Sequence, residues 1–162
     1  MIKIYDTSSL LLMDDISLFD KNSLTVITSI TLKELERIKT SVNKDANVKY
    51  SARQLLRLLD ENPEAYTCCV YKPNMNKWIE AYGLEITDDT KLLATACDYI
   101  KSLGCQLEDL EFYTNDLALK KIATIFFGAL QVKSVKIEED KYTGYKEFYF
   151  TDEEIADFYS NP

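Results

Sequence analysis

Four acidic side chains stand at points of this sequence where carboxylates could act together on one ligand. Asp6 and Asp116 each follow a short apolar run, whereas Glu34 and Asp89 lie near the starts of amphipathic segments. Asp88 is an alternative to Asp89 because the acid is doubled there, although the spacing to the leucines that follow favours Asp89. Carboxylates that converge repel one another unless a cation neutralises them. Convergence of these acids would therefore predict a divalent metal ion.

The residue types that are missing narrow the chemistry further. The chain contains no histidine, and its four cysteines, which we interpret as buried reduced thiols, show no C-x-x-C spacing. A zinc site, a Ser-His-Asp or Cys-His nucleophile and histidine acid–base catalysis are therefore excluded. Ligands that are all oxygen favour Mg²⁺ or Mn²⁺. Taken singly, each acid also has a simpler interpretation as a helix cap.

The elements that must position the acids alternate between strand and helix. This alternation predicts an α/β fold, a three-layer α/β/α sandwich with a central, mostly parallel sheet of about five strands. In such sheets the ligand site lies at the carboxyl ends of the strands, where Asp6 and Asp116 should meet Glu34 and Asp89 from the first turns of their helices. Apolar runs predict strands at residues 2–5, 24–29, 65–71, 110–116 and 130–137. Apolar periodicity predicts a short helix after Asp6 and longer helices at residues 30–41, 48–62, 87–104 and 116–128. Residues 74–83 could be either helix or loop.

The length of 162 residues and the composition suit one globular domain. No apolar run reaches the roughly 18 residues that a membrane span requires, and the first residues lack the layout of a signal peptide. We therefore expect a cytoplasmic location and no membrane contact.

The charge of the chain is unevenly distributed. The net charge is −8, which taken alone argues against a nucleic-acid partner, but residues 33–57 hold seven basic side chains against three acids. Such a segment could present a basic face to phosphates, or it could be only a solvated helix surface. The candidates for binding a phosphate backbone are Arg37, Lys39, Lys44, Arg53 and Lys120.

Four ordered motifs resemble those of PIN domain nucleases. They are "IYDTSSLL", "ITLKELERIK", "DDTKLLATA" and "TNDLALKKIA", which carry the four acids, and "YTG" at residues 142–144 is similar to the variety found at the N-terminus of PhoH-like proteins. No single motif is specific, but the ordered set is. The resemblance spans about residues 2–145, and we expect residues 1–145 to form a PIN-like nuclease domain and residues 146–162 to add a strand and helix to the same domain.

The resemblance implies a metal-dependent endoribonuclease that cleaves single-stranded or structured RNA, with DNA as an alternative substrate. A water activated by carboxylate-bound Mg²⁺ or Mn²⁺ would attack the phosphodiester. Asp6, Asp89 and Asp116 would hold the metal, and Glu34 would hold a second metal or orient the water. The supporting residues would be Thr7, Ser8, Thr114 and Asn115.

The resemblance also leaves alternatives open. The chain carries no G-x-x-x-x-G-K-[ST] motif, so it is either a free-standing PIN domain or a fragment of a longer PhoH-like protein. An antitoxin-like or other protein partner and a homodimer are implied by resemblance only. A catalytically silent PIN fold that binds RNA or protein is the main rival. A haloacid-dehalogenase-type phosphatase is disfavoured, because "DTSSL" lacks the second acid of D-x-D-x-T.

Overall fold

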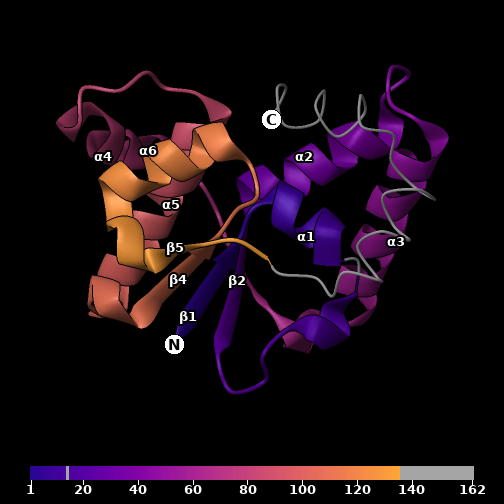
Figure 1. The fold of residues 1–162 in the computed structure, drawn as a ribbon, viewed down its shortest axis with the longest axis horizontal. Coiled ribbons are helices and arrows are strands. Elements are labelled where there is room, and N and C mark those ends of the chain that lie inside the picture. The colour runs from indigo at the N-terminus through magenta and orange to yellow at the C-terminus, as the bar shows by residue number, and fades with distance from the viewer. Residues whose placement is uncertain (14, 136–162) are drawn as a thin grey trace.

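A five-stranded sheet lies between two layers of helices in the computed structural model, which describes residues 1–13 and 15–135 (Figure 1). Every adjacent pair of strands is parallel. This arrangement confirms the predicted α/β/α sandwich. The strands are β1 (Ile2–Tyr5), β2 (Leu24–Thr28), β3 (Thr67–Cys69), β4 (Leu110–Tyr113) and β5 (Val132–Lys133), and their order in the sheet is β3-β2-β1-β4-β5.

The path of the chain reverses at the middle of the sheet. From β1 it builds outward through β2 to β3, and it then crosses back to place β4 on the other side of β1. Tyr5 at the end of β1 is in register with Tyr113 at the end of β4. Ligand sites of parallel α/β sheets lie outside the carboxyl ends of the strands at such a reversal. The fold therefore predicts a ligand site at the residues that follow β1 and β4.

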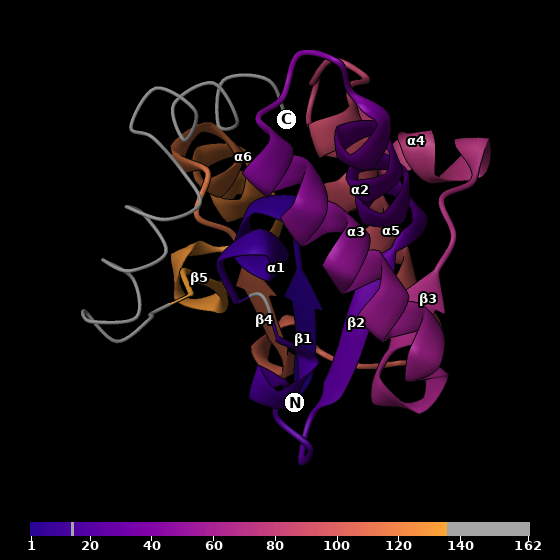
Figure 2. The same cartoon turned by 90° about the vertical axis from the view of Figure 1, so that its right-hand side faces the viewer.

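Helices lie on both faces of the sheet (Figures 1 and 2). No helix of the described part of the chain is both long and apolar enough to cross a membrane. One layer holds α1 (Thr7–Met13), α2 (Ser29–Thr40) and α3 (Ala46–Glu61). The other layer holds α4 (Asn76–Ala81), α5 (Asp88–Ser102) and α6 (Leu117–Phe127). Short 3₁₀ turns lie at Ile16–Leu18, Pro63–Ala65, Pro73–Met75, Leu107–Asp109 and Ala129–Gln131.

Alternation along the strands divides the core into two parts. Successive side chains of a strand point to opposite faces of the sheet. Ile2 and Ile4 accordingly pack with apolar residues of α5 and α6, whereas Tyr5 and Ile27 pack with those of α1, α2 and α3. Both faces of the central strands are thus buried, as a parallel sheet between helix layers requires.

Several predicted boundaries need correction. The third strand was expected over residues 65–71, but β3 spans only Thr67–Cys69. The 3₁₀ turn at Pro63–Ala65 precedes it, and among the described strands it pairs with β2 alone. The fourth strand stops at Tyr113, so residues 114–116 connect β4 to α6. Glu34 lies in the second turn of α2, not the first.

Other expectations fall on the remaining segments. The ambiguous residues 74–83 contain α4 and part of the 3₁₀ turn before it. The expected fifth strand is described only to residue 135, where β5 covers Val132–Lys133. The "YTG" motif, the boundary at residue 145, and the expected strand and helix of residues 146–162 lie outside the described residues.

Candidate active site

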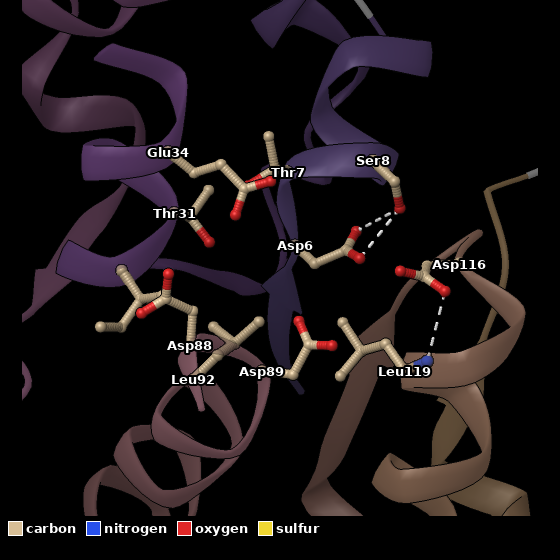
Figure 3. A pocket seen from close by; sticks show the side chains of 11 residues that line it. Asp6, Thr7, Ser8, Thr31, Glu34, Asp88, Asp89, Leu92, Asp116 and Leu119 are labelled. Carbon is tan, nitrogen blue, oxygen red and sulfur yellow. Dashed lines mark hydrogen bonds between the residues drawn. The ribbon is translucent and has the colours of Figure 1, made fainter. Parts of the chain in front are cut away.

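A pocket lies where the chain reverses between β1 and β4, and its walls are rich in carboxylates (Figure 3). The cavity volume is about 20 Å³, enough for a water molecule or a small cation but not for a nucleotide. The structure thus brings all four predicted acids, and the alternative Asp88, to one place. The lining residues are Asp6, Glu34, Asp88, Asp89 and Asp116, the hydroxyl residues Thr7, Ser8 and Thr31, and the apolar Ile30, Leu92 and Leu119.

The Asp6 carboxylate is buried, and donors from two distant segments surround it. The Ser8 hydroxyl lies 2.9 Å from both Asp6 oxygens, and the Ser9 backbone N–H donates to Oδ1 at 2.8 Å. The Thr114 hydroxyl donates to Oδ2 at 2.6 Å from across the sheet. Burial raises the pKa of Asp6, and these hydrogen bonds act in the opposite direction because they stabilise the charged form. Asp6 is therefore held in one orientation between β1 and β4.

Ser9 contributes to this site although the motif did not single it out. Its hydroxyl lies within hydrogen-bonding distance of the Asp6 carboxylate and 2.6 Å from the Tyr113 carbonyl oxygen. A hydroxyl carries one proton, so Ser9 donates fully to only one of these acceptors at a time. The only sign of Ser9 in the sequence is that it is the second serine of "DTSS". That pattern is too common to indicate a residue of a functional site. Thr7, which was predicted, contributes to the pocket wall.

Asp116 combines a structural duty with its place in the pocket. Its Oδ1 accepts hydrogen bonds from the backbone N–H groups of Ala118 at 2.9 Å and Leu119 at 3.3 Å, so it caps α6. The Thr114 hydroxyl in turn accepts from the Asp116 N–H at 3.1 Å. In Figure 3 the second carboxylate oxygen of Asp116 lies on the side of Asp6. The capping interpretation is thus correct for this acid, and it leaves one oxygen for a ligand.

Asn115 holds the segment after β5 against the site. Its side-chain oxygen accepts from the Val135 N–H at 3.0 Å, its amide group donates to the Val135 carbonyl at 3.3 Å, and its own N–H donates to the Ser8 hydroxyl at 3.1 Å. The predicted supporting residues Ser8, Thr114 and Asn115 therefore form one hydrogen-bonded unit with Asp6.

Glu34 and Asp89 have no capping duty that would explain their positions. The N-terminus of α2 is capped by the Thr28 hydroxyl, and that of α5 by the Thr87 hydroxyl. Thr90 returns a hydrogen bond to the Thr87 N–H at 2.8 Å, which completes a capping box. Both side chains nevertheless line the pocket (Figure 3).

The charges of the pocket act on one another. Burial, followed by the charges of Asp6 and Asp89, raises the pKa of Glu34 to about 7. Burial, followed by the charges of Asp116 and Asp6, raises the pKa of Asp89 to about 6. Carboxylates with raised pKa values in a small cleft are typical of functional sites. The pocket therefore concentrates negative charge that a cation would relieve.

Asp88 differs from Asp89 in its surroundings. Its Oδ2 lies 3.5 Å from Nη2 of Arg37, and the two side chains are 39% and 59% exposed. The pair connects the start of α5 to α2 at the mouth of the pocket. The geometry thus places Asp89 against the other acids and Asp88 against a cation.

The donor set fits a Mg²⁺ or Mn²⁺ ion in type and charge, because every candidate ligand is a carboxylate or hydroxyl oxygen. Within residues 1–13 and 15–135, however, no three acidic or cysteine side chains are grouped tightly enough to coordinate one ion as they stand. Asp6, Asp89 and Asp116 would have to turn toward a common point to bind it.

The predicted phosphate-binding residues do not gather at the pocket. Lys39 pairs with Glu36 at 3.1 Å and Arg37 pairs with Asp88. Lys44 lies in the loop before α3 and has contacts within the protein. Arg53 is exposed on α3, and Lys120 lies in the first turn of α6, one turn beyond Asp116.

A parallel α/β/α sandwich with clustered acids at its chain reversal is an arrangement that nuclease folds share with other α/β proteins. The PIN domain family model matches residues 3–133, and the chain therefore belongs to the PIN domain family. None of the curated proteins matches this sequence. The match is to the PIN domain in general, and the PhoH-associated variety stays a prediction.

Proposed function

We propose that this protein is a Mg²⁺- or Mn²⁺-dependent endoribonuclease that cleaves single-stranded or structured RNA. The observation that carries the proposal is the crowding of Asp6, Glu34, Asp89 and Asp116 in one small pocket, with neither lysine nor arginine among its lining residues. Burial, and after it the charges of the neighbouring carboxylates, raises the pKa values of Glu34 and Asp89. Membership of the PIN domain family supports the same chemistry.

The residues divide the work by position. Asp6, Asp89 and Asp116 would hold the ion, and the donors around Asp6 would keep its carboxylate oriented. A bound ion supplies Lewis-acid chemistry, which activates water and neutralises charge at the phosphorus. Glu34, whose pKa of about 7 suits an acceptor of protons near neutrality, would orient the attacking water or help to hold a second ion.

Cleavage of labelled oligonucleotides tests this proposal. We expect the purified protein to cut single-stranded RNA in Mn²⁺ or Mg²⁺ and to lose this activity in EDTA. Asp6→Asn and Asp116→Asn should lower the rate by about 10²- to 10⁴-fold, since each removes a ligand charge worth several kcal/mol in the transition state. Asn caps a helix about as well as Asp, so Asp116→Asn should leave α6 intact.

The control is Asp60→Asn, which changes an exposed aspartate of α3 outside the pocket and should retain wild-type rates. Single-stranded DNA of the same sequence, tested in parallel, decides between RNA and DNA as substrate. Equal cleavage by the wild type and the two pocket variants, or cleavage that persists in EDTA, would refute the assignment.

A catalytically silent PIN fold that binds RNA or protein is the second candidate. The acids line one pocket, but within the described residues no three of them are close enough together to hold an ion. This spacing favours the silent fold. In that case the protein would bind RNA equally well with and without divalent metal and leave it intact. Titration with Mn²⁺ of the wild type and of Asp6→Asn separates the two candidates. Only the nuclease requires a metal site, and Asp6→Asn weakens that site.

A further inference from the structure

Three lysines of α4 and α5 lie over two aromatic rings, that of Tyr71 in the segment after β3 and that of Trp78 on α4. The Lys91 ammonium lies 5.3 Å from the centre of the Tyr71 ring. Lys77 and Lys101 lie 5.6 Å and 5.3 Å from the Trp78 ring. These distances are those of cation–π contacts. We call these five residues the α4–α5 aromatic surface.

The cations of this surface differ from those of the predicted basic segment. Among the ion pairs of the described residues, none involves Lys77, Lys91 or Lys101, which contact the two rings. In the basic segment, by contrast, several cations already have carboxylate partners: Arg37 pairs with Asp88, Lys39 with Glu36 and Arg57 with Glu61. The lysines of the α4–α5 aromatic surface are therefore the better placed to accept an anion from outside.

The two rings are fixed in place. Both pack against a small cluster formed by Met75, Ile79 and Ala94. The Trp78 indole N–H donates to Asp98 at 3.3 Å, and the Tyr71 hydroxyl donates to the Asn76 side chain at 2.5 Å. Side chains that are already ordered lose little conformational entropy when a ligand binds. The lysines above them thus stand on a rigid support.

The α4–α5 aromatic surface begins next to the carboxylate pocket. Lys91 follows Asp89 by two residues on α5, and the Tyr71 N–H donates to the Ser29 hydroxyl at the start of α2. From Lys91 to Lys101 the helix advances by about 15 Å, at roughly 1.5 Å per residue. The surface therefore leads from the pocket along α5 over a distance that spans several phosphates of a single strand.

We propose that the α4–α5 aromatic surface binds the single-stranded RNA segment that flanks the bond held at the carboxylate pocket. Lys77, Lys91 and Lys101 contact its phosphates, and the accessible parts of Tyr71 and Trp78 contact its bases. Lysines beside aromatic rings are the combination by which proteins hold single strands without regard to sequence. The inference rests on the proposed function, since it makes the surface the extension of that site.

The single tryptophan of the chain provides a direct measurement. Titration of the wild type with a twelve-residue oligouridine in EDTA, where cleavage cannot occur, should quench the fluorescence of Trp78. Double-stranded RNA of the same length, whose bases are stacked away, should quench it much less. An unchanged emission at oligouridine concentrations that saturate binding would overturn the proposal.

Charge removal tests the lysines. The triple variant Lys77→Gln, Lys91→Gln, Lys101→Gln should bind oligouridine at least tenfold more weakly at 0.1 M salt. The slope of log K against log salt should fall by about 2, because each phosphate contact to a single strand contributes roughly 0.7. The matched triple Lys21→Gln, Lys33→Gln, Lys49→Gln carries the same change in net charge and should shift affinity by less than threefold.

Equal losses in the two triple variants would reduce the effect to net charge and overturn the proposal. A surface that instead serves a protein partner would leave oligouridine binding by the first triple unchanged, and that result would overturn the proposal as well. Failure of the proposed function looks different: the wild type would quench and bind as expected but cleave nothing in Mn²⁺. Cleavage without quenching would refute only the α4–α5 aromatic surface.

Discussion

The Asp6 carboxylate owes its position to hydroxyl groups rather than to an opposite charge. Ser8 and Ser9 come from the first turn of α1, and Thr114 comes from the segment after β4. Hydrogen bonds to a carboxylate stabilise its charged form and fix its direction. The site therefore keeps a buried acid oriented without a permanent cation, which leaves the charge available to a metal ion.

Removal of the Ser9 hydroxyl tests this support. Ser9→Ala should lower the free energy of unfolding by about 1–3 kcal/mol, because it removes the donor that the buried Asp6 carboxylate and the Tyr113 carbonyl share. Urea denaturation measures the change. Ser102→Ala is the control, since that hydroxyl is exposed and bonds only to a carbonyl of its own helix. Similar midpoints for the two variants would contradict the role assigned to Ser9.

At the scale of residues, the sequence was sufficient to predict that the acids converge and that Ser8, Thr114 and Asn115 lie beside Asp6, but not that Ser9 and Thr31 join them. Asp6 and Asp116 follow apolar strands, and strand ends meet at one edge of a parallel sheet, so their convergence follows from local pattern plus topology. The positions of Ser9 and Thr31 depend on how helices are rotated against the sheet, which one-dimensional spacing does not specify. Charge counting placed most of the phosphate-binding residues in the segment 33–57, but it cannot show that Lys39 has an acidic partner.

The elements α2 and α5 both line the pocket, and the Arg37–Asp88 pair links them. Exposed ion pairs contribute at most about 1 kcal/mol, so this pair positions the walls more than it stabilises the fold. It also separates the two adjacent acids of α5 by function. Asp89 faces the carboxylates, and Asp88 holds a cation.

Calorimetric titration with Mn²⁺ distinguishes these roles. Asp89→Asn should weaken Mn²⁺ binding at least tenfold, because it removes a ligand oxygen charge from the pocket. Asp88→Asn should change the affinity by less than threefold, since Arg37 already neutralises much of that charge. The reverse order of effects would make Asp88 the ligand and show that the spacing to the leucines is no guide to it.

Most elements follow from local signals, and the exceptions have a common cause. The helices α2, α5 and α6 show apolar periodicity together with capping residues, and each lies within two residues of its predicted bounds. The third strand was overestimated because apolar residues at a sheet edge read like a longer strand, although pairing with only one neighbour supports three residues. The 3₁₀ turns depend on how the chain enters and leaves the sheet, and local composition carries little trace of that.

For the molecule as a whole, the crowded carboxylates make stability depend on pH. The pKa of Glu34 rises to about 7 and that of Asp89 to about 6 in the folded protein. An acid whose folded pKa lies above its unfolded value binds protons better when folded. Its contribution to stability is therefore present at pH 4 and is lost as the pH rises to about 7. A metal ion that bound only the folded protein would offset that loss.

Urea unfolding at pH 5 and pH 8 measures this dependence. In EDTA, the two acids together should lower the stability at pH 8 by on the order of 3–4 kcal/mol relative to pH 5. Addition of 5 mM Mg²⁺ should recover stability at pH 8 and have a smaller effect at pH 5, where protons compete. In the double variant Glu34→Gln, Asp89→Asn both effects should shrink; the same pH and Mg²⁺ responses as in the wild type would show that other groups cause them.

The central place of β1 has a consequence for the life of the newly made chain. Ile2 pairs with Leu110, and the Asp6 N–H donates to the Tyr113 carbonyl. More than a hundred residues must therefore be synthesised after β1 before β4, its second neighbouring strand, is present. Pairing over such sequence separations is slow and comes late in folding. During synthesis, Asp6 and Asp116 therefore stay apart until β4 has emerged from the ribosome. Every nascent chain that is too short to expose β4 and Asp116 therefore carries Asp6 without the carboxylate pocket.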